Sequence, residues 1–433
     1  MKRKILLAAV LLASSFSFAQ KFENRASFWI KPDKTQNSKQ TLNKNASING
    51  NVKQSLTTEI GSGNSNFYVV FKSEDGVEKD LLNFTFTCYQ HTVTTHNINY
   101  NDPKTIDQKR RTGAIVKYGF NYPNASGDKN FVTVSDKQND LTDVYEVIYV
   151  NDAFTDLDHQ QVQTYLSLKY GISLINDGNY VDANGISIWN NQLNKTYNQF
   201  ITGVGRSDYF GLNKLQTSNS VDKRLEISSN GFANNEYLLI GTNNEKQSFT
   251  NTNDAEILDA SWLVQTNAKA NLSTLKFNLD NLKSTGVYEL VLNASSNFEN
   301  AANNTRFQGK VEGNQLVFEN VMFDADGSGS DTFTISYATK AKETTKPEIV
   351  NKTEVNAYPN PTNINENVTV AYNFAKPTNL NIHVFTVDGK FIKKQEVTNS
   401  TSYQFETSFS ASGVYLIVST YDGQVTTSRI VVK

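Results

Sequence analysis

Short stretches of apolar residues, or of apolar residues alternating with polar ones, recur along the chain between turn-forming residues. They are rich in β-branched and aromatic residues, a composition that favours strands. In the N-terminal part the pattern predicts strands at 26–30, 67–72, 82–89, 113–121, 130–135 and 144–150. Many short strands followed by one helix are typical of a β-sandwich, which we predict for residues 20–172.

The last of these strands, VYEVIYV at 144–150, is apolar on both faces and should therefore be covered on both sides. Strict alternation places Tyr145, Val147 and Tyr149 on one face, and Val144, Glu146, Ile148 and Val150 on the other. A short helix should follow, with Thr155 as its N-cap and Gly171 just beyond its end. We expect Val162, Tyr165 and Leu166 on its buried face.

Two further β-rich regions follow. Strand patterns at 236–241, 260–265, 275–279, 287–292, 316–321 and 332–337 predict a second sandwich over residues 173–340. A stretch rich in Lys, Thr and Glu, containing Pro347, predicts a linker at 341–355. Strands at 380–385, 391–397, 414–421 and 425–432 predict a small Ig-like sandwich over 356–433. The predicted fold class is thus all-β, with tandem β-sandwiches.

The N-terminus carries an export signal. Basic residues at 2–4 precede an apolar stretch that is too short to span a bilayer, and Ser17-Phe18-Ala19 offers a cleavage site before Gln20. We therefore predict a signal peptide at 1–19, cleaved near Ala19–Gln20, and passage through the periplasm. No other stretch predicts a membrane-spanning segment.

Composition narrows the function classes. The net charge is −2 and the isoelectric point is about 6.2, so nothing predicts a nucleic-acid partner. The single cysteine, Cys88, excludes an internal disulfide and is expected to be a buried, inert thiol.

Two segments resemble known surface proteins. YEVIYVN followed by AFTDLDHQQVQTYL is similar to the closing strand and helix of LamG/concanavalin A-like jelly rolls, although His159 stands where that pattern often carries Glu. YLSLKYGISL, and FITGVGRSD at 200–208, resemble segments of large surface proteins of the Bacteroidetes. The resemblance implies a jelly roll over 20–172 that runs into a second β-rich domain.

The C-terminal region resembles the type A sorting domain of the type IX secretion system. The motifs that carry this resemblance are Tyr358-Pro359-Asn360-Pro361, Asp388-Gly389-Lys390, Gly413 with Tyr415, and the terminal Lys433. The resemblance implies that the type IX secretion machinery is a partner and that the protein reaches the outer surface or the medium. It also implies a sorting domain that is often cleaved, with the cargo released or attached to surface polysaccharide.

One loop is a candidate metal site. Asp324, Asp326 and Asp331 lie in the glycine-containing stretch DADGSGSD, and alternate carboxylates suit Ca²⁺. A polar hairpin loop explains the same residues, because Asp-Gly is also a turn signal. Apart from this Ca²⁺, the sequence predicts no cofactor.

No catalytic motif is found: HExxH, GxSxG and GxxxxGK[ST] are all absent. Asp143 and Glu146 are the nearest acid pair on a strand, but they should point to opposite faces, and we expect Glu146 to be a structural charge at a strand edge. His159 and His383 are expected at the surface. Trp189 is the tryptophan most suited to stacking on a sugar.

We therefore expect a non-enzymatic secreted or surface protein that acts in adhesion or in binding a glycan or matrix. A secreted carbohydrate-active enzyme and a structural spacer of the cell surface remain the alternatives.

Overall fold

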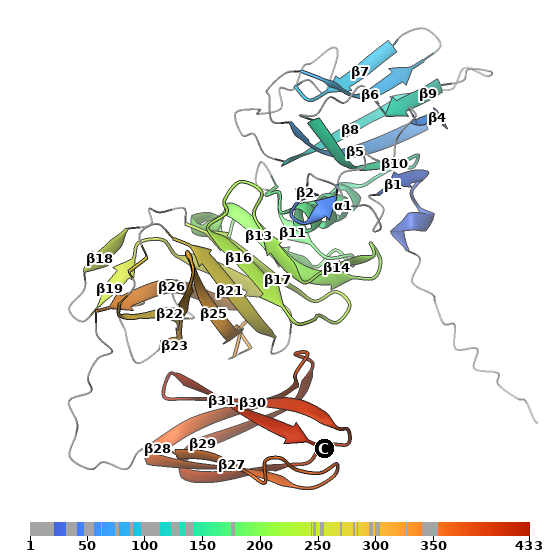
Figure 1. The fold of residues 1–433 in the computed structure, drawn as a ribbon. Helices are drawn as coiled ribbons and strands as arrows, with labels where there is room; N and C mark the ends of the chain where they lie inside the picture. The colour runs from blue at the N-terminus through green and yellow to red at the C-terminus, as the bar shows by residue number, and fades with distance from the viewer. Residues whose placement is uncertain are drawn as a thin grey trace, which may run out of the picture.

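The computed structural model describes residues 21–339 and 354–433, except for 32–40, 47–55, 62, 74–77, 87–89, 97–112, 123–129, 135–141, 175–177, 244, 246–247, 252–254, 269–270, 280–281, 284, 294–297, 299–303 and 326. The predicted signal peptide, Cys88, Asp326 and most of the predicted linker lie outside this range. Figure 1 shows three β-rich units in chain order, with helix α1 (Asp156–Tyr170) between the first and second. The predicted all-β class is confirmed. Within the described residues, no helix has the length and apolarity needed to cross a membrane.

The first unit is a pair of four-stranded antiparallel sheets. One sheet has the order β1-β10-β5-β8, formed by Phe28–Ile30, Thr142–Val150, Gly63–Ser73 and Gly113–Tyr122. The other has the order β4-β9-β6-β7, formed by Leu56–Ile60, Asn130–Val134, Asp80–Thr85 and Gln90–Thr94. Phe67, Phe84 and Val132 belong to the apolar core between the two sheets.

Strand β10 is covered on both faces, as the sequence predicts. Val147 and Tyr149 lie in the core between the sheets, whereas Ile148 and Val150 face helix α1. The predicted alternation is wrong at the start of the strand, because the register shifts between Val144 and Glu146. A β-bulge adds one residue to one strand of a pair, so Val144 lies in the inter-sheet core and Tyr145 on the helix side.

Helix α1 begins and ends at the predicted residues. Thr155 is its N-cap and forms a reciprocal capping box with Asp158, which satisfies backbone groups that the helix cannot pair itself. Gly171 ends the helix with a left-handed φ of 66°. The predicted face, containing Tyr165 and Leu166, is buried in a core that draws residues from both the first and the second unit.

The second unit is also a sandwich. One sheet has the order β14-β13-β17-β20-β26-β22-β23, formed by Leu212–Lys214, Gln199–Ser207, Tyr237–Thr242, Trp262–Thr266, Ser330–Ala338, Val287–Asn293 and Thr305–Gln308. The other has the order β15-β16-β21-β25-β24, formed by Gln216–Ser218, Leu225–Ser229, Leu272–Asn278, Gln315–Met322 and Lys310–Glu312. The core between them includes Trp262, Phe277 and Phe333.

The third unit consists of β27 (Glu354–Tyr358), β28 (Val368–Thr386), β29 (Phe391–Thr407), β30 (Gly413–Tyr421) and β31 (Gln424–Val432). The long strand β28 pairs with β27, β29 and β30, and β30 pairs with β31. The strands enclose a separate apolar core that includes Val370, Ile382 and Ile417.

Candidate functional site

The predicted sorting residues are far apart in the sequence but meet at one end of the third unit. The turn at 386–390 is joined to the start of β30, because the Val387 amide donates to the Val414 carbonyl over 2.9 Å. β30 begins beside the end of β31. There the Lys433 amide donates to the Thr362 carbonyl over 2.9 Å. The sheet pairing therefore gathers all four predicted motifs on one end.

The segment at 358–361 is held to β31 by the side chain of Asn360. Its Nδ2 donates to the Arg429 carbonyl over 2.6 Å, and its Oδ1 accepts from the Val431 amide over 2.9 Å. The side-chain amide of Asn360 thus forms hydrogen bonds with two backbone groups at the edge of β31. Tyr358 is 50% exposed, so the segment presents an aromatic ring next to a fixed backbone.

The turn at 386–390 presents two opposite charges. Gly389 has a φ of +82°, and its amide donates to the Thr386 carbonyl over 2.9 Å. A hydrogen bond from the Thr386 side chain lowers the pKa of Asp388, so this carboxylate stays ionised. Asp388 and Lys390 are both exposed. Tyr415, in contrast, is buried against Phe409 at a ring distance of 3.9 Å, which indicates a packing role.

A second cluster surrounds Glu146, which is fully buried. Its Oε1 accepts from Trp29 Nε1 and from the Tyr165 hydroxyl at 2.8 Å, and its Oε2 accepts from Lys169 Nζ at 2.6 Å and the Tyr170 hydroxyl at 2.7 Å. Burial first, and then the negative charge of Glu146, raise the pKa of both tyrosines well above the usual value. The tyrosines therefore remain protonated donors, and the cluster ties helix α1 to strand β10.

This geometry corrects the prediction of a charge at a strand edge. β10 lies between β1 and β5, so Glu146 is inside the sheet and not at its edge. None of the four hydrogen bonds given above involves a second carboxylate. The side chain of Asp143 lies outside the described residues.

Two further surface predictions are wrong. Trp189 is 1% exposed, and its Nε1 donates to Asn198 Oδ1 over 3.0 Å, so its ring is not available for sugar stacking. His383 is 2% exposed, because the outer face of its strand is covered. His159 is partly buried and lies 2.5 Å from the Tyr68 hydroxyl through Nδ1.

In the candidate calcium loop, the described carboxylates accept hydrogen bonds from backbone amides of the same loop. Asp324 Oδ1 accepts from the Gly329 amide over 2.6 Å, and Asp331 Oδ2 accepts from the Asp324 amide over 2.5 Å. Over the residues that the structure describes, no group of three or more His, Cys, Asp and Glu side chains is arranged to hold a metal. The Ca²⁺ site at Asp324, Asp326 and Asp331 stays a prediction, which thermal unfolding in Ca²⁺ and in EDTA would test.

The burial of one charged residue, Lys214, has no signal in the sequence. Lys214 is 9% exposed, and its Nζ donates to the backbone carbonyl of Asn43 over 2.7 Å. Burial, followed by repulsion from Lys44 and Lys169, lowers the pKa of Lys214 to about 7. Its partner is 171 positions away in the sequence, so only the tertiary structure reveals the contact.

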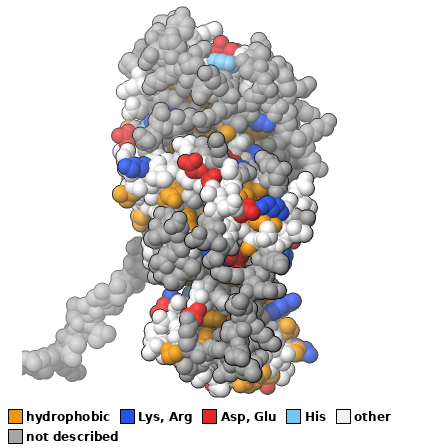
Figure 2. All heavy atoms as spheres, turned by 90° about the vertical axis from the view of Figure 1, so that its left-hand side faces the viewer, with side chains coloured by type: hydrophobic (Ala, Val, Ile, Leu, Met, Phe, Trp, Pro, Cys, Tyr) orange, Lys and Arg blue, Asp and Glu red, His pale blue; other side chains and the backbone are white. Residues whose placement is uncertain are grey.

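Charges elsewhere are mixed. On the face shown in Figure 2, the coloured acidic and basic side chains are interspersed, in keeping with the net charge of −2. The fold is that of a multi-unit β protein whose C-terminal unit carries the predicted sorting motifs at one end.

Comparison with protein families gives two matches. Residues 356–433 match a family described as "Secretion system C-terminal sorting domain". This segment is therefore the C-terminal sorting domain of the type IX secretion system, and it directs the chain to the outer surface or the extracellular space. Residues 158–328, which begin within helix α1, match a "Domain of unknown function (DUF8202)". No curated protein matches the chain.

Several solved structures share a distant likeness. A polysaccharide lyase is 9% identical over 51% of this chain and 35% of its own, with a TM-score of 0.19. A β-glucuronidase of Parabacteroides merdae is 9% identical over 38% of this chain and 28% of its own, with a TM-score of 0.14. The adhesin domain of Epf from Streptococcus pyogenes is 10% identical over 43% and 83%, with a TM-score of 0.15. The chain thus spans about a third of the length of the lyase, and TM-scores this low carry no functional argument.

Proposed function

We propose that this is a non-enzymatic adhesion or glycan-binding protein that the type IX secretion system exports to the cell surface or the medium. The observation that carries the proposal is the sorting domain at 356–433, which fixes the route of the chain. The first two units are then the part that acts outside the cell. We further propose that the sorting domain is of type A and that its motif residues are those gathered at one end of the unit.

We also propose that the first unit is concanavalin A-like, and its fold supports this proposal. Two antiparallel four-stranded sheets face one another across an apolar core, and α1 lies against the outside of the sheet that contains β10. Glu146, one of the two acids that the sequence singled out in this unit, accepts four hydrogen bonds, three of them from side chains of helix α1. A retaining glycosidase needs a second carboxylate at about 5 Å from the first. The hydrogen bonds of Glu146 thus favour a structural role over catalysis.

Incubation of the full chain with a panel of polysaccharides tests the proposal. We expect one or more polysaccharides to retard the protein in affinity electrophoresis while their chain length stays unchanged. The same protein unfolded in urea is the control, and its migration should not respond to the polysaccharide. Shortened products would instead establish the carbohydrate-active enzyme. A single stoichiometric protein partner, with no polysaccharide bound, would establish the structural spacer.

A further inference from the structure

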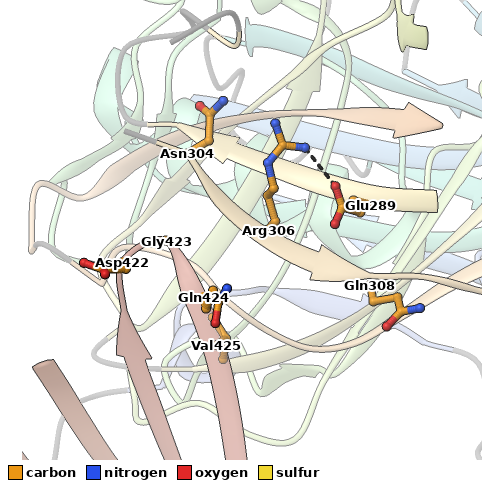
Figure 3. A pocket seen from close by; sticks show the side chains of 8 residues that line it. All are labelled: Glu289, Asn304, Arg306, Gln308, Asp422, Gly423, Gln424 and Val425. Carbon is orange, nitrogen blue, oxygen red and sulfur yellow. Dashed lines mark hydrogen bonds and ion pairs between the residues drawn. The ribbon is translucent and has the colours of Figure 1, made fainter. Parts of the chain in front are cut away.

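The edge of the second unit meets the edge of the sorting domain. β23 is the last strand of its sheet before the sorting domain, and Arg306 lies opposite Gln424 of β31 in a parallel bridge. The Arg306 amide donates to the Gly423 carbonyl over 3.2 Å. Edge strands carry unpaired backbone groups, and natural proteins cover or interrupt them. Figure 3 shows the turn at 422–424 beside this strand.

Next to this edge, apolar side chains of the two units are buried against one another. Leu272 and Met322 of the second unit form a cluster with Phe385 and Val418 of the sorting domain, and all four are at most 2% exposed. Val425 is partly buried and packs against both this cluster and the core of the second unit. His383 lies opposite Val418 in the sheet, which explains why its predicted surface position is wrong.

The backbones also fit closely at two separate points. A Cβ atom added at Gly423 would lie 2.4 Å from the Asn304 carbonyl oxygen. A Cβ atom added at Gly389 would lie 2.3 Å from Asn230 Cβ. Both glycines are in turns of the sorting domain, and both neighbours belong to the second unit. The contact between the two units therefore includes at least these two separate points and is not confined to one bridge.

The rim of the contact is polar. A cavity of about 410 Å³ lies between the units and is lined by Glu289, Asn304, Arg306, Gln308 and residues 422–425 (Figure 3). Arg306 and Glu289 form an ion pair at 2.9 Å within it. A small apolar centre with a polar rim is typical of contacts between domains that can separate.

We propose that the sorting domain has a second role as an intramolecular cap: it docks on the second unit and covers the β23 edge together with Leu272 and Met322. The cap keeps this edge from pairing with other strands for as long as the sorting domain is attached. Loss of the sorting domain exposes the edge and the two apolar side chains at the same time. This surface of the sorting domain thus binds the second unit of the same chain.

Cross-linking of the full chain tests the docking directly. Bridge partners in a sheet have Cα atoms within the range that a disulfide spans. With Cys88→Ser as background, the pair Arg306→Cys and Gln424→Cys should oxidise to an intramolecular disulfide, seen as the loss of two hydrogens in the intact mass of the monomer. The matched pair Arg306→Cys and Lys393→Cys should not, because β29 is three strands away from β31. Equal yields for the two pairs, or no disulfide in the first, would overturn the proposal.

Hydrogen exchange provides a second readout that needs no cysteine. Val425→Asp places a charge in the contact, whereas Ile392→Asp places the same charge on an exposed side chain of β29. We expect the Arg306 amide to exchange at least about tenfold faster in Val425→Asp and at the wild-type rate in Ile392→Asp. An unchanged rate in Val425→Asp would contradict the cap. So would a rate raised equally by both variants.

Discussion

At the scale of single residues, two buried charges are stabilised to very different degrees. Glu146 accepts hydrogen bonds from four side chains, one of them the cation Lys169. Lys214 has one carbonyl partner and two neighbouring cations that raise the free energy of its charged form. A satisfied buried charge holds its surroundings in place, whereas a poorly compensated one makes stability depend on pH.

Substitution of Glu146 tests the first case. Glu146→Gln keeps the shape but turns one acceptor into a donor that faces other donors, and it leaves Lys169 without an opposite charge. We expect the free energy of unfolding to fall by about 3–5 kcal/mol in urea titrations. The control, Glu23→Gln, removes an ion pair of 3.7 Å between Lys31 and Glu23, whose side chain is 66% exposed. It should change the free energy of unfolding by less than about 0.5 kcal/mol. Equal losses in the two variants would contradict the structural role.

Lys214 predicts a pH dependence. Its folded pKa of about 7 lies below the ordinary 10.5, so between these values the unfolded chain binds more protons than the folded one. The free energy of unfolding should therefore rise with pH across this window, by at most about 1.4 kcal/mol per pH unit from this group. Lys214→Met should flatten the profile. Lys310→Met, at a side chain that is 64% exposed, should leave it unchanged. A wild-type profile that is already flat would refute the expectation.

At the scale of elements, the end of helix α1 depends on one glycine. Gly171 has a left-handed φ, and a Cβ atom there would lie 2.3 Å from the Ser218 carbonyl oxygen. The helix must therefore end at a residue without a side chain in order to pack against the second unit. Gly211 has nearly the same φ, +64°, but open space around it.

These two glycines form a matched pair for mutagenesis. Gly211→Ala should cost about 1–2 kcal/mol of unfolding free energy, because it meets only the backbone strain of the left-handed region. Gly171→Ala should cost at least about twice as much, because the backbone oxygen of Ser218 cannot move away without shifting its strand. Urea unfolding followed by circular dichroism gives both values. Similar losses of unfolding free energy in the two variants would mean that the close contact at Gly171 does not affect stability.

The sequence predicts local elements well where local chemistry decides them. Thr155 and Gly171 mark the ends of the helix because capping depends on neighbouring residues. The displacement of Tyr145 by the bulge depends on the partner strand and has no local signal. β28 runs from 368 to 386, beyond the predicted 380–385, because pairing with β29 extends it past Pro377. The sequence predicts the sorting motif residues, but that these residues meet at one end of the unit follows only from strand pairing.

At the scale of the whole molecule, the sorting domain determines the destination of the chain. Its match covers residues 356–433, and its strands enclose an apolar core of their own. Export should thus depend on this unit as a whole, while the first two units share the core around helix α1.

Deletion of 356–433 tests this division in the producing cell. We expect the truncated chain to accumulate inside the cell envelope and to disappear from the outer surface and the medium, as measured by fractionation and immunoblotting. The full chain with Ile392→Asp, which changes one exposed side chain of β29, should be exported normally. Arrival of the truncated chain in the medium would contradict the assigned route.

The core around helix α1 contains Tyr68 and Ile148 from the first unit together with Ile201 and Leu239 from the second. A chimaera assembled by cutting the chain at residue 172 would therefore leave apolar side chains of this core open to water on each product. Protein engineers who want to transplant the N-terminal sandwich should therefore carry both sandwiches as one cassette.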